Sequence, residues 1–144
     1  MSVILSCQSI SKAFSTRTLF RNLSFGVFDG DRTGIIGPNG AGKSTLMKIM
    51  AGLESTDEGN ISLRKHSRVG YIPQVTVLDP EKSVREIVSE AISGEDDITR
   101  RVETVLSKTG FENPEIKSAV LSGGWKKRVS IASAYHAILN RNPI

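Results

Sequence analysis

The stretch that decides the fold is Gly37-Pro38-Asn39-Gly40-Ala41-Gly42-Lys43-Ser44, which fits the pattern G-x-x-x-x-G-K-[ST]. Its glycines permit backbone conformations closed to other residues and leave no side chain between the amides and an anion. Successive N–H groups can then form an anion nest at the positive end of a following helix. Lys43 supplies a charge for the β- and γ-phosphates, Ser44 a hydroxyl for Mg²⁺, and Thr45 a further hydrogen bond. The pattern therefore predicts a cradle for the phosphates of a nucleotide.

The segments on either side of this cradle favour the same interpretation. Residues 33–36 are a short apolar run, which predicts a strand before the glycines. Leu46, Ile49 and Met50 recur at helical spacing before Gly52, which predicts a helix after them. The alternative is a chance glycine-rich turn, and the order strand, loop, helix argues against it.

The rest of the chain divides into a strand-rich part and a helical part. Apolar runs bounded by turn residues predict strands at residues 3–7, 23–28, 61–63 and 68–72. Apolar residues at helical spacing predict three helices, and Ser83 with Glu86 has the spacing of a capping box. The predicted helices run from Ser83 to an end at Gly94, over residues 97–109, and from Ser122 toward Asn140, the last with Val129, Ala132 and Leu139 inward. The sequence thus predicts an α/β fold.

Composition and charge are those of an ordinary globular protein. Hydrophobic residues make up 38% and charged residues 24%, which does not favour disorder. The formal net charge is +4, and the basic residues are spread along the chain, which favours the surface of a nucleotide-binding protein over a nucleic-acid partner. The single cysteine, Cys7, is typical of a reducing cytoplasm. No window approaches the ~20 apolar residues of a membrane span, so we expect a soluble, cytoplasmic chain.

A second motif, Leu121-Ser122-Gly123-Gly124-Trp125, begins the last predicted helix. By itself, such an entry is often only a capped helix, yet its hydroxyl and amides also form a second anion-binding helix start. Paired with the phosphate cradle, the motif resembles the ATP-binding-cassette (ABC) family, in which the signature motif of one cassette caps the γ-phosphate held by the P-loop of another. The resemblance implies an α/β P-loop NTPase fold and a second cassette as partner, in a head-to-tail sandwich around two ATP molecules.

Other motifs of that family appear in the same order. Phe14 stands where the family has an aromatic residue that stacks on adenine, and Gly70-Tyr71-Ile72-Pro73-Gln74 resembles the Q-loop, whose glutamine reaches Mg²⁺ and the attacking water. The resemblance covers nearly all of residues 1–144 and implies a partial ABC nucleotide-binding domain. Its expected parts are a strand-rich ATP-binding part with the P-loop and Q-loop over 1–80, a helical subdomain over 81–121 and a signature helix over 122–144.

The resemblance implies ATP and Mg²⁺ as ligands. Ser44 and Gln74 would bind the metal ion, and Lys43 and Gln74 would contribute to catalysis without completing a catalytic site. Without the family context, Phe14 could equally be a core residue and Gln74 an ordinary loop residue. The implied nucleotide-binding residues are Phe14, Gly37, Pro38, Asn39, Gly40, Ala41, Gly42, Lys43, Ser44, Thr45, Gln74, Ser122, Gly123 and Gly124.

The family's remaining catalytic residues have no counterpart in residues 1–144. In the family, an apolar strand after the position of Ile144 carries an aspartate for the Mg²⁺ shell and a glutamate that polarises water. That strand would lie beside residues 33–36, so we expect an incomplete core. We also expect this chain to bind ATP with little or no hydrolysis, because no carboxylate positions the water.

The branch of the family is suggested by Trp125-Lys126-Lys127-Arg128-Val129. This run resembles the F-type, Uup-like cassettes, which are soluble ATPases that act on ribosomes or nucleic acid. The alternative is the ATPase subunit of an ABC membrane transporter, which would reach the membrane only through a partner subunit. A third hypothesis is a non-catalytic nucleotide-binding or interaction module.

Overall fold

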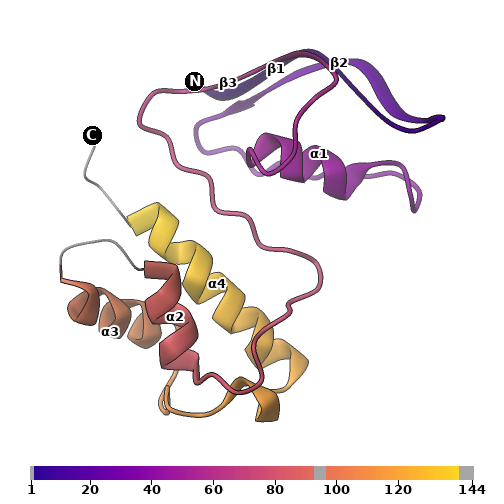
Figure 1. The fold of residues 1–144 in the computed structure, drawn as a ribbon. Helices are drawn as coiled ribbons and strands as arrows, with labels where there is room; N and C mark the ends of the chain where they lie inside the picture. Colours follow the sequence, from indigo (N-terminus) through magenta and orange to yellow (C-terminus); the bar gives the residue numbers. More distant parts are fainter. Residues whose placement is uncertain (1, 93–96, 140–144) are drawn as a thin grey trace. The chain divides into compact units, whose positions relative to one another are not determined.

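The computed structural model describes residues 2–92 and 97–139, with side chains of the last helix described to residue 135 (Figure 1). Contacts divide the chain into two compact units, Met1–Ser67 and Arg68–Ile144. Each unit is described by itself below. The expected parts, 1–80, 81–121 and 122–144, stay a prediction.

The first unit contains a three-stranded antiparallel sheet in the order β2-β1-β3. Its strands are β1 (Val3–Phe14), β2 (Arg17–Phe28) and β3 (Glu58–Leu63). The strands predicted at residues 3–7, 23–28 and 61–63 are confirmed. All three are longer than predicted, because hydrogen bonds between neighbouring strands continue through polar residues that carry no apolar signal.

A single helix of the first unit, α1 (Lys43–Met50), lies next to this sheet (Figure 1). Leu46 and Ile49 are its buried residues, as helical spacing predicts. Leu46 joins a small core with Leu5, Cys7 and Ile10 of β1. This packing fixes the start of α1, and therefore the loop before it, against the sheet.

Two predicted strands, residues 33–36 and 68–72, are absent from the structure. Ile36 is 97% exposed, and neither segment joins a sheet within the part of the chain that the structure describes. An apolar run becomes a strand only when another segment satisfies its backbone N–H and C=O groups, and no described segment does so here. The prediction of a strand before the glycine-rich loop was therefore wrong for this chain.

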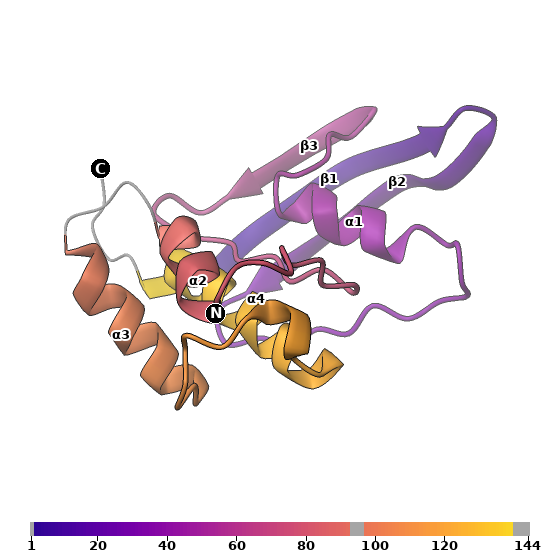
Figure 2. The same ribbon diagram turned by 60° about the horizontal axis from the view of Figure 1, so that its bottom comes forward.

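The second unit is helical, with α2 (Val84–Ile92), α3 (Ile98–Thr109), the short 3₁₀-helix η1 (Ser118–Val120) and α4 (Gly123–Leu139). Figure 2 shows α2, α3 and α4 gathered in one group. Val129 and Ala132 are buried as predicted, whereas Gly94 and the side chain of Leu139 lie outside the described residues. The helices share one core, made of Val84, Val88, Ile92, Val102, Val105, Leu106, Phe111, Val129 and Ala132.

The start of α2 has the capping box that the sequence predicts, and a glycine ends α3. The Ser83 N–H donates to Glu86 Oε2 at 2.7 Å, and the Glu86 N–H donates to Ser83 Oγ at 3.2 Å, which is a capping box. Gly110 ends α3 in the left-handed region, with φ +76°. Arg85 on α2 forms ion pairs with Glu103 on α3 and with Glu115, so charge links the helices at the rim of the core.

A test of the sheet compares Gly59→Ala with Gly30→Ala. The two glycines have nearly equal φ, +83° and +84°. A Cβ at Gly59 would lie 2.5 Å from the Gln8 and Ser9 carbonyl oxygens, whereas a Cβ at Gly30 would meet no heavy atom within 4 Å. We expect Gly30→Ala to lower the free energy of unfolding by about 1–2 kcal/mol through strain alone. Gly59→Ala should lower the free energy of unfolding clearly more, because the added Cβ would force β1 and β3 apart. Urea denaturation midpoints of the two variants measure these losses of stability. Equal losses for both variants would contradict the packing argument.

A second test concerns the capping box. Hydrogen bonds from the Ser83 backbone N–H and then the Ser83 hydroxyl lower the pKa of Glu86. Its folded pKa therefore lies below the unfolded value, so its stabilisation is present above the unfolded pKa and is lost as the pH falls through the folded one. We expect Glu86→Gln, which cannot titrate, to lose less stability than the wild type between about pH 7 and about pH 3. Urea midpoints at both pH values check this. An unchanged pH dependence in Glu86→Gln would contradict this expectation.

Candidate nucleotide-binding site

The loop of residues 37–42 leads directly into α1 and has the backbone that its glycines predict. Gly40 and Gly42 have φ +78° and +90°, in the left-handed region that disfavours other residues. A Cβ at Gly42 would lie 3.0 Å from the Leu19 Cβ, so β2 packs closely against this turn. Conformation and packing thus both require glycine at Gly42, the residue that precedes the first turn of α1.

The Lys43 ammonium closes the loop on itself. Its Nζ donates to the carbonyl oxygens of Gly37 and Pro38, each at 2.8 Å. The Ala41 N–H also donates to the Pro38 carbonyl, at 3.2 Å. Phosphate oxygens are stronger acceptors for an ammonium than neutral carbonyls, so Lys43 can exchange these contacts for a triphosphate.

Arg17 links the turn after Phe14 to the same loop. Its Nη2 donates to the Gly40 carbonyl oxygen at 3.0 Å. Arg17 begins β2 and Phe14 ends β1, so this bond holds the end of the hairpin beside the loop. Phe14 is 50% exposed, which leaves part of its ring accessible to a ligand. Sequence reasoning missed Arg17, because no pattern relates it to the glycines.

Ser44 and Thr45 lie in the first turn of α1, as predicted, with Ser44 exposed and Thr45 half-buried. Among the described residues, no group of three or more His, Cys, Asp or Glu could hold a metal ion. Mg²⁺ at nucleotide sites keeps several waters and takes much of its shell from phosphates, so it needs few protein ligands. The exposed Ser44 hydroxyl suits such an ion once a triphosphate is bound.

Gln74 belongs to the second unit, in an irregular segment that α4 holds in place. Lys127 Nζ donates to the Pro73 carbonyl oxygen and, at 3.0 Å, to that of Gln74. One turn further along α4, Ser130 Oγ and Thr76 Oγ1 are 2.9 Å apart and hydrogen-bonded. The exposed Gln74 thus extends from a backbone fixed by α4, a link that sequence reasoning did not identify.

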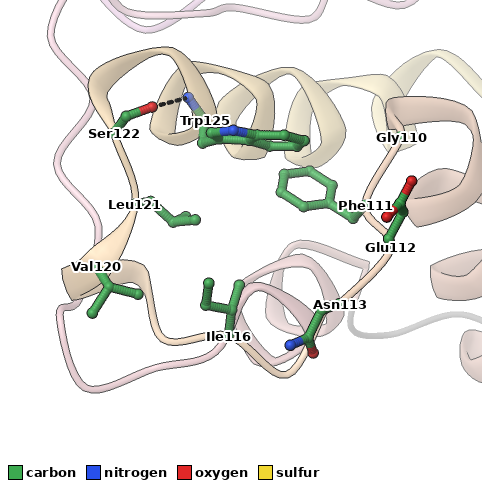
Figure 3. A pocket seen from close by; sticks show the side chains of 9 residues that line it. All are labelled: Gly110, Phe111, Glu112, Asn113, Ile116, Val120, Leu121, Ser122 and Trp125. Atoms are coloured by element: carbon green, nitrogen blue, oxygen red, sulfur yellow. Dashed lines mark hydrogen bonds between the residues drawn. The ribbon is translucent and has the colours of Figure 1, made fainter.

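Ser122 acts as the cap of α4. Its Oγ accepts the Trp125 N–H at 3.4 Å, and its carbonyl oxygen accepts the Lys126 N–H at 2.9 Å (Figure 3). A Cβ at Gly123 would meet nothing within 4 Å, and one at Gly124 only the Ser122 Oγ at 4.0 Å, so packing does not require glycine at either position. Instead they leave the N-terminal amides of α4 open to approach, where the helix dipole attracts an anion.

Trp125 packs both against the segment after α3 and against Arg128 of its own helix. Its ring centroid is 5.2 Å from that of Phe111, with the planes at 53°, and the Arg128 guanidinium lies 4.6 Å from the indole centroid. Figure 3 shows the two rings as neighbouring walls of a cavity that begins at Ser122. The cavity has a volume of about 600 Å³ and is lined by Gly110, Phe111, Glu112, Asn113, Ile116, Val120, Leu121, Ser122 and Trp125.

The predicted site residues thus form two sets, one in each unit. Phe14 and residues 37–45 share the first unit, where Arg17 connects the hairpin to the loop. Gln74 and residues 122–124 share the second, where Lys127 connects the segment of Gln74 to α4. The first set can hold a triphosphate and a base, and the second offers an amide and an open helix start.

Comparisons with known proteins point to one family. The sequence profile of the family described as "ABC transporter" matches residues 20–140. The chain is 38% identical over 112 residues to the uncharacterized ABC transporter ATP-binding protein YfmM of Bacillus subtilis strain 168, covering 78% of this chain and 22% of that protein. It is 33% identical over 137 residues to the energy-dependent translational throttle protein EttA of Mycobacterium tuberculosis H37Rv, covering 90% of this chain and 24% of that protein.

A solved structure described as the ATP binding subunit of an ABC transporter resembles this chain with a TM-score of 0.78 and 27% identity, covering 93% of this chain and 62% of that one. The chain spans less than a quarter of the length of the two curated relatives. The match to the family profile extends over most of the sequence, including the loop and the signature motif. The chain therefore belongs to the ABC transporter family and has the P-loop NTPase fold of an ABC nucleotide-binding domain.

Proposed function

We propose that this chain binds Mg·ATP and that residues 37–45 hold the triphosphate. The proposal is supported mainly by the conformation of this loop. Glycines with positive φ lead into α1, and the Lys43 ammonium donates to two carbonyl oxygens of the loop. The backbone amides orient the phosphates, Lys43 neutralises their charge, and Ser44 ligates Mg²⁺. Phe14 stacks on the base from the hairpin end that Arg17 fixes.

The second set of residues serves the same nucleotide chemistry. Gln74 contacts the Mg²⁺ shell, and Ser122, Gly123 and Gly124 bind the γ-phosphate held by a second cassette, as the family resemblance implies. The open amides at the start of α4 support this role. Among the residues named here, Lys43 and Gln74 contribute to catalysis but neither is a base for the attacking water.

We further propose the F-type, Uup-like branch, in which the complete protein is an ATPase that acts on the ribosome in the cytoplasm. The similarity to a translational throttle protein and the run Trp125-Lys126-Lys127-Arg128 support it. The second candidate is the ATPase subunit of a membrane transporter, favoured by the similarity to such a subunit. Within residues 2–92 and 97–139, no helix has both the length and the apolar character to cross a bilayer.

The binding proposal is tested with Lys43→Ala. Loss of the ammonium removes the charge that faces the β- and γ-phosphates, so we expect affinity for Mg·ATP to fall by at least about tenfold. Isothermal titration calorimetry measures this, with circular dichroism to confirm that the variant is folded. Lys48→Ala, on an exposed lysine of the same helix, should retain the wild-type affinity. Equal ATP affinity before and after Lys43→Ala would support a non-catalytic interaction module instead.

The branch is tested by cell fractionation of the natural protein that carries this chain. We expect it to sediment with ribosomes when ATP is present, and we expect Lys43→Ala to weaken that association, because closure of the cassettes depends on bound ATP. Recovery in the membrane fraction together with membrane-spanning subunits would favour the transporter instead.

A further inference from the structure

A charged side chain is buried beside the base-stacking residue. Lys12 lies near the end of β1 and is only 6% exposed, although lysine is among the residues least often buried. Phe14 follows two residues later and is half exposed. Because a buried charge is costly unless it is paired, the surroundings of Lys12 must compensate it.

Three oxygen atoms surround the Lys12 ammonium. Its Nζ is 3.1 Å from Glu54 Oε1, 2.8 Å from the Ser55 carbonyl oxygen and 3.2 Å from Asp57 Oδ1. An ammonium has three N–H donors, so each can find an acceptor here. The hydrogen bond to Glu54, together with the hydrogen bond to Asp57, raises the pKa of Lys12, so the cation persists at neutral pH. Lys12 is therefore held in one place by the segment between α1 and β3.

Asp57 also holds the backbone that carries Phe14. Its Oδ2 accepts the Ala13 N–H at 2.7 Å, and its own N–H donates to the Ser11 carbonyl oxygen at 3.0 Å. These two hydrogen bonds lie on either side of Lys12, where the pairing register between β1 and β2 is irregular. Asp57 thus fixes, through its carboxylate and its backbone, the stretch of β1 that strand pairing leaves irregular.

The Lys12 cation lies over the ring of Phe14, with Nζ 5.4 Å from the ring centroid. A cation at this distance is attracted to the face of an aromatic ring. One face of the ring is therefore directed toward the buried charge, and the exposed part remains for a ligand. A ring ordered before binding does not have to lose rotamer freedom when a base stacks on it.

We propose that Lys12 and Asp57 are positioning residues for Phe14, which hold its ring in the orientation that stacks on the base of the nucleotide. This inference rests on the proposed function of Phe14. The affinity for the base then depends on the pair, whereas the affinity for the triphosphate, held by residues 37–45, does not. The pair thereby favours a nucleoside triphosphate over a free polyphosphate chain.

The experiment measures two ligands, Mg·ATP and Mg·tripolyphosphate, by calorimetry on the 144-residue chain. We expect Lys12→Met to weaken ATP binding about three- to tenfold, the range of an aromatic stack and a cation–π contact, with tripolyphosphate within about twofold of wild type. Lys12→Arg, which keeps the cation, should restore most of the ATP preference. Asp57→Asn keeps an oxygen acceptor for the Ala13 N–H but removes the charge, and should give a smaller loss.

A double-mutant cycle makes the test specific. Phe14→Ala should remove the preference for ATP, and Lys12→Met in that background should then have no further effect on the ratio of the two affinities. An unchanged ratio in Lys12→Met overturns the inference, as does an equal loss for both ligands or the unfolding of both Lys12→Met and Asp57→Asn, because the pair would then serve only the fold. Failure of the proposed function looks different: the wild type would bind neither ligand.

Discussion

The structure depends on one turn, at which the backbone leaves the glycine-rich loop and enters α1. Gly42 has φ +90° there, and the Cβ of Leu19 on β2 lies only 3.0 Å from the position that a Cβ of residue 42 would take. The turn is therefore shaped by the sheet as well as by its own sequence. Burial of Leu46 against β1 holds α1 in place, and only then do the first amides of the helix point together. The nucleotide binding that we propose would therefore rest on the hydrophobic contact of Leu46, the residue that directly follows the proposed phosphate-binding residues.

The helices could be predicted from sequence because their hydrogen bonds and caps are local. Val84, Val88 and Ile92 form one stripe, and Ser83 with Glu86 marks its start, so the predicted start of α2 agrees within a residue. Residues 33–36 and 68–72 carry an equally clear apolar signal and yet form no strand. A strand needs a partner from elsewhere in the chain, and a run of apolar residues does not say whether that partner is present. The strands predicted at residues 3–7, 23–28 and 61–63 have such partners, because they pair with one another in one antiparallel sheet.

The candidate site divides in the same way. Lys43, Ser44 and the glycines follow from spacing alone, because the loop and the helix start are continuous in sequence. Spacing in the sequence could not identify the roles of Lys12, Arg17 and Lys127. Each has a long side chain whose hydrogen-bond acceptors lie far along the chain. Their roles depend on which backbone carbonyls the fold brings within reach. A sequence pattern can thus name the groups that meet a ligand, while the groups that hold them emerge only from tertiary structure.

The basic run after the signature motif shows why tertiary contacts matter when a function is inferred from a sequence pattern. As a sequence, Lys126-Lys127-Arg128 follows Trp125 in a run that resembles F-type cassettes. In the structure, Lys127 binds the backbone of the segment with Gln74, and Arg128 lies over the Trp125 ring. Two of the three charged side chains thus have contacts within the protein: Lys127 connects α4 to the segment of Gln74, and Arg128 packs on a ring of the same helix. The internal contacts of Lys127 and Arg128 thus account for two of these residues without a contact with RNA, and the run supports the branch that we propose through its resemblance to F-type cassettes.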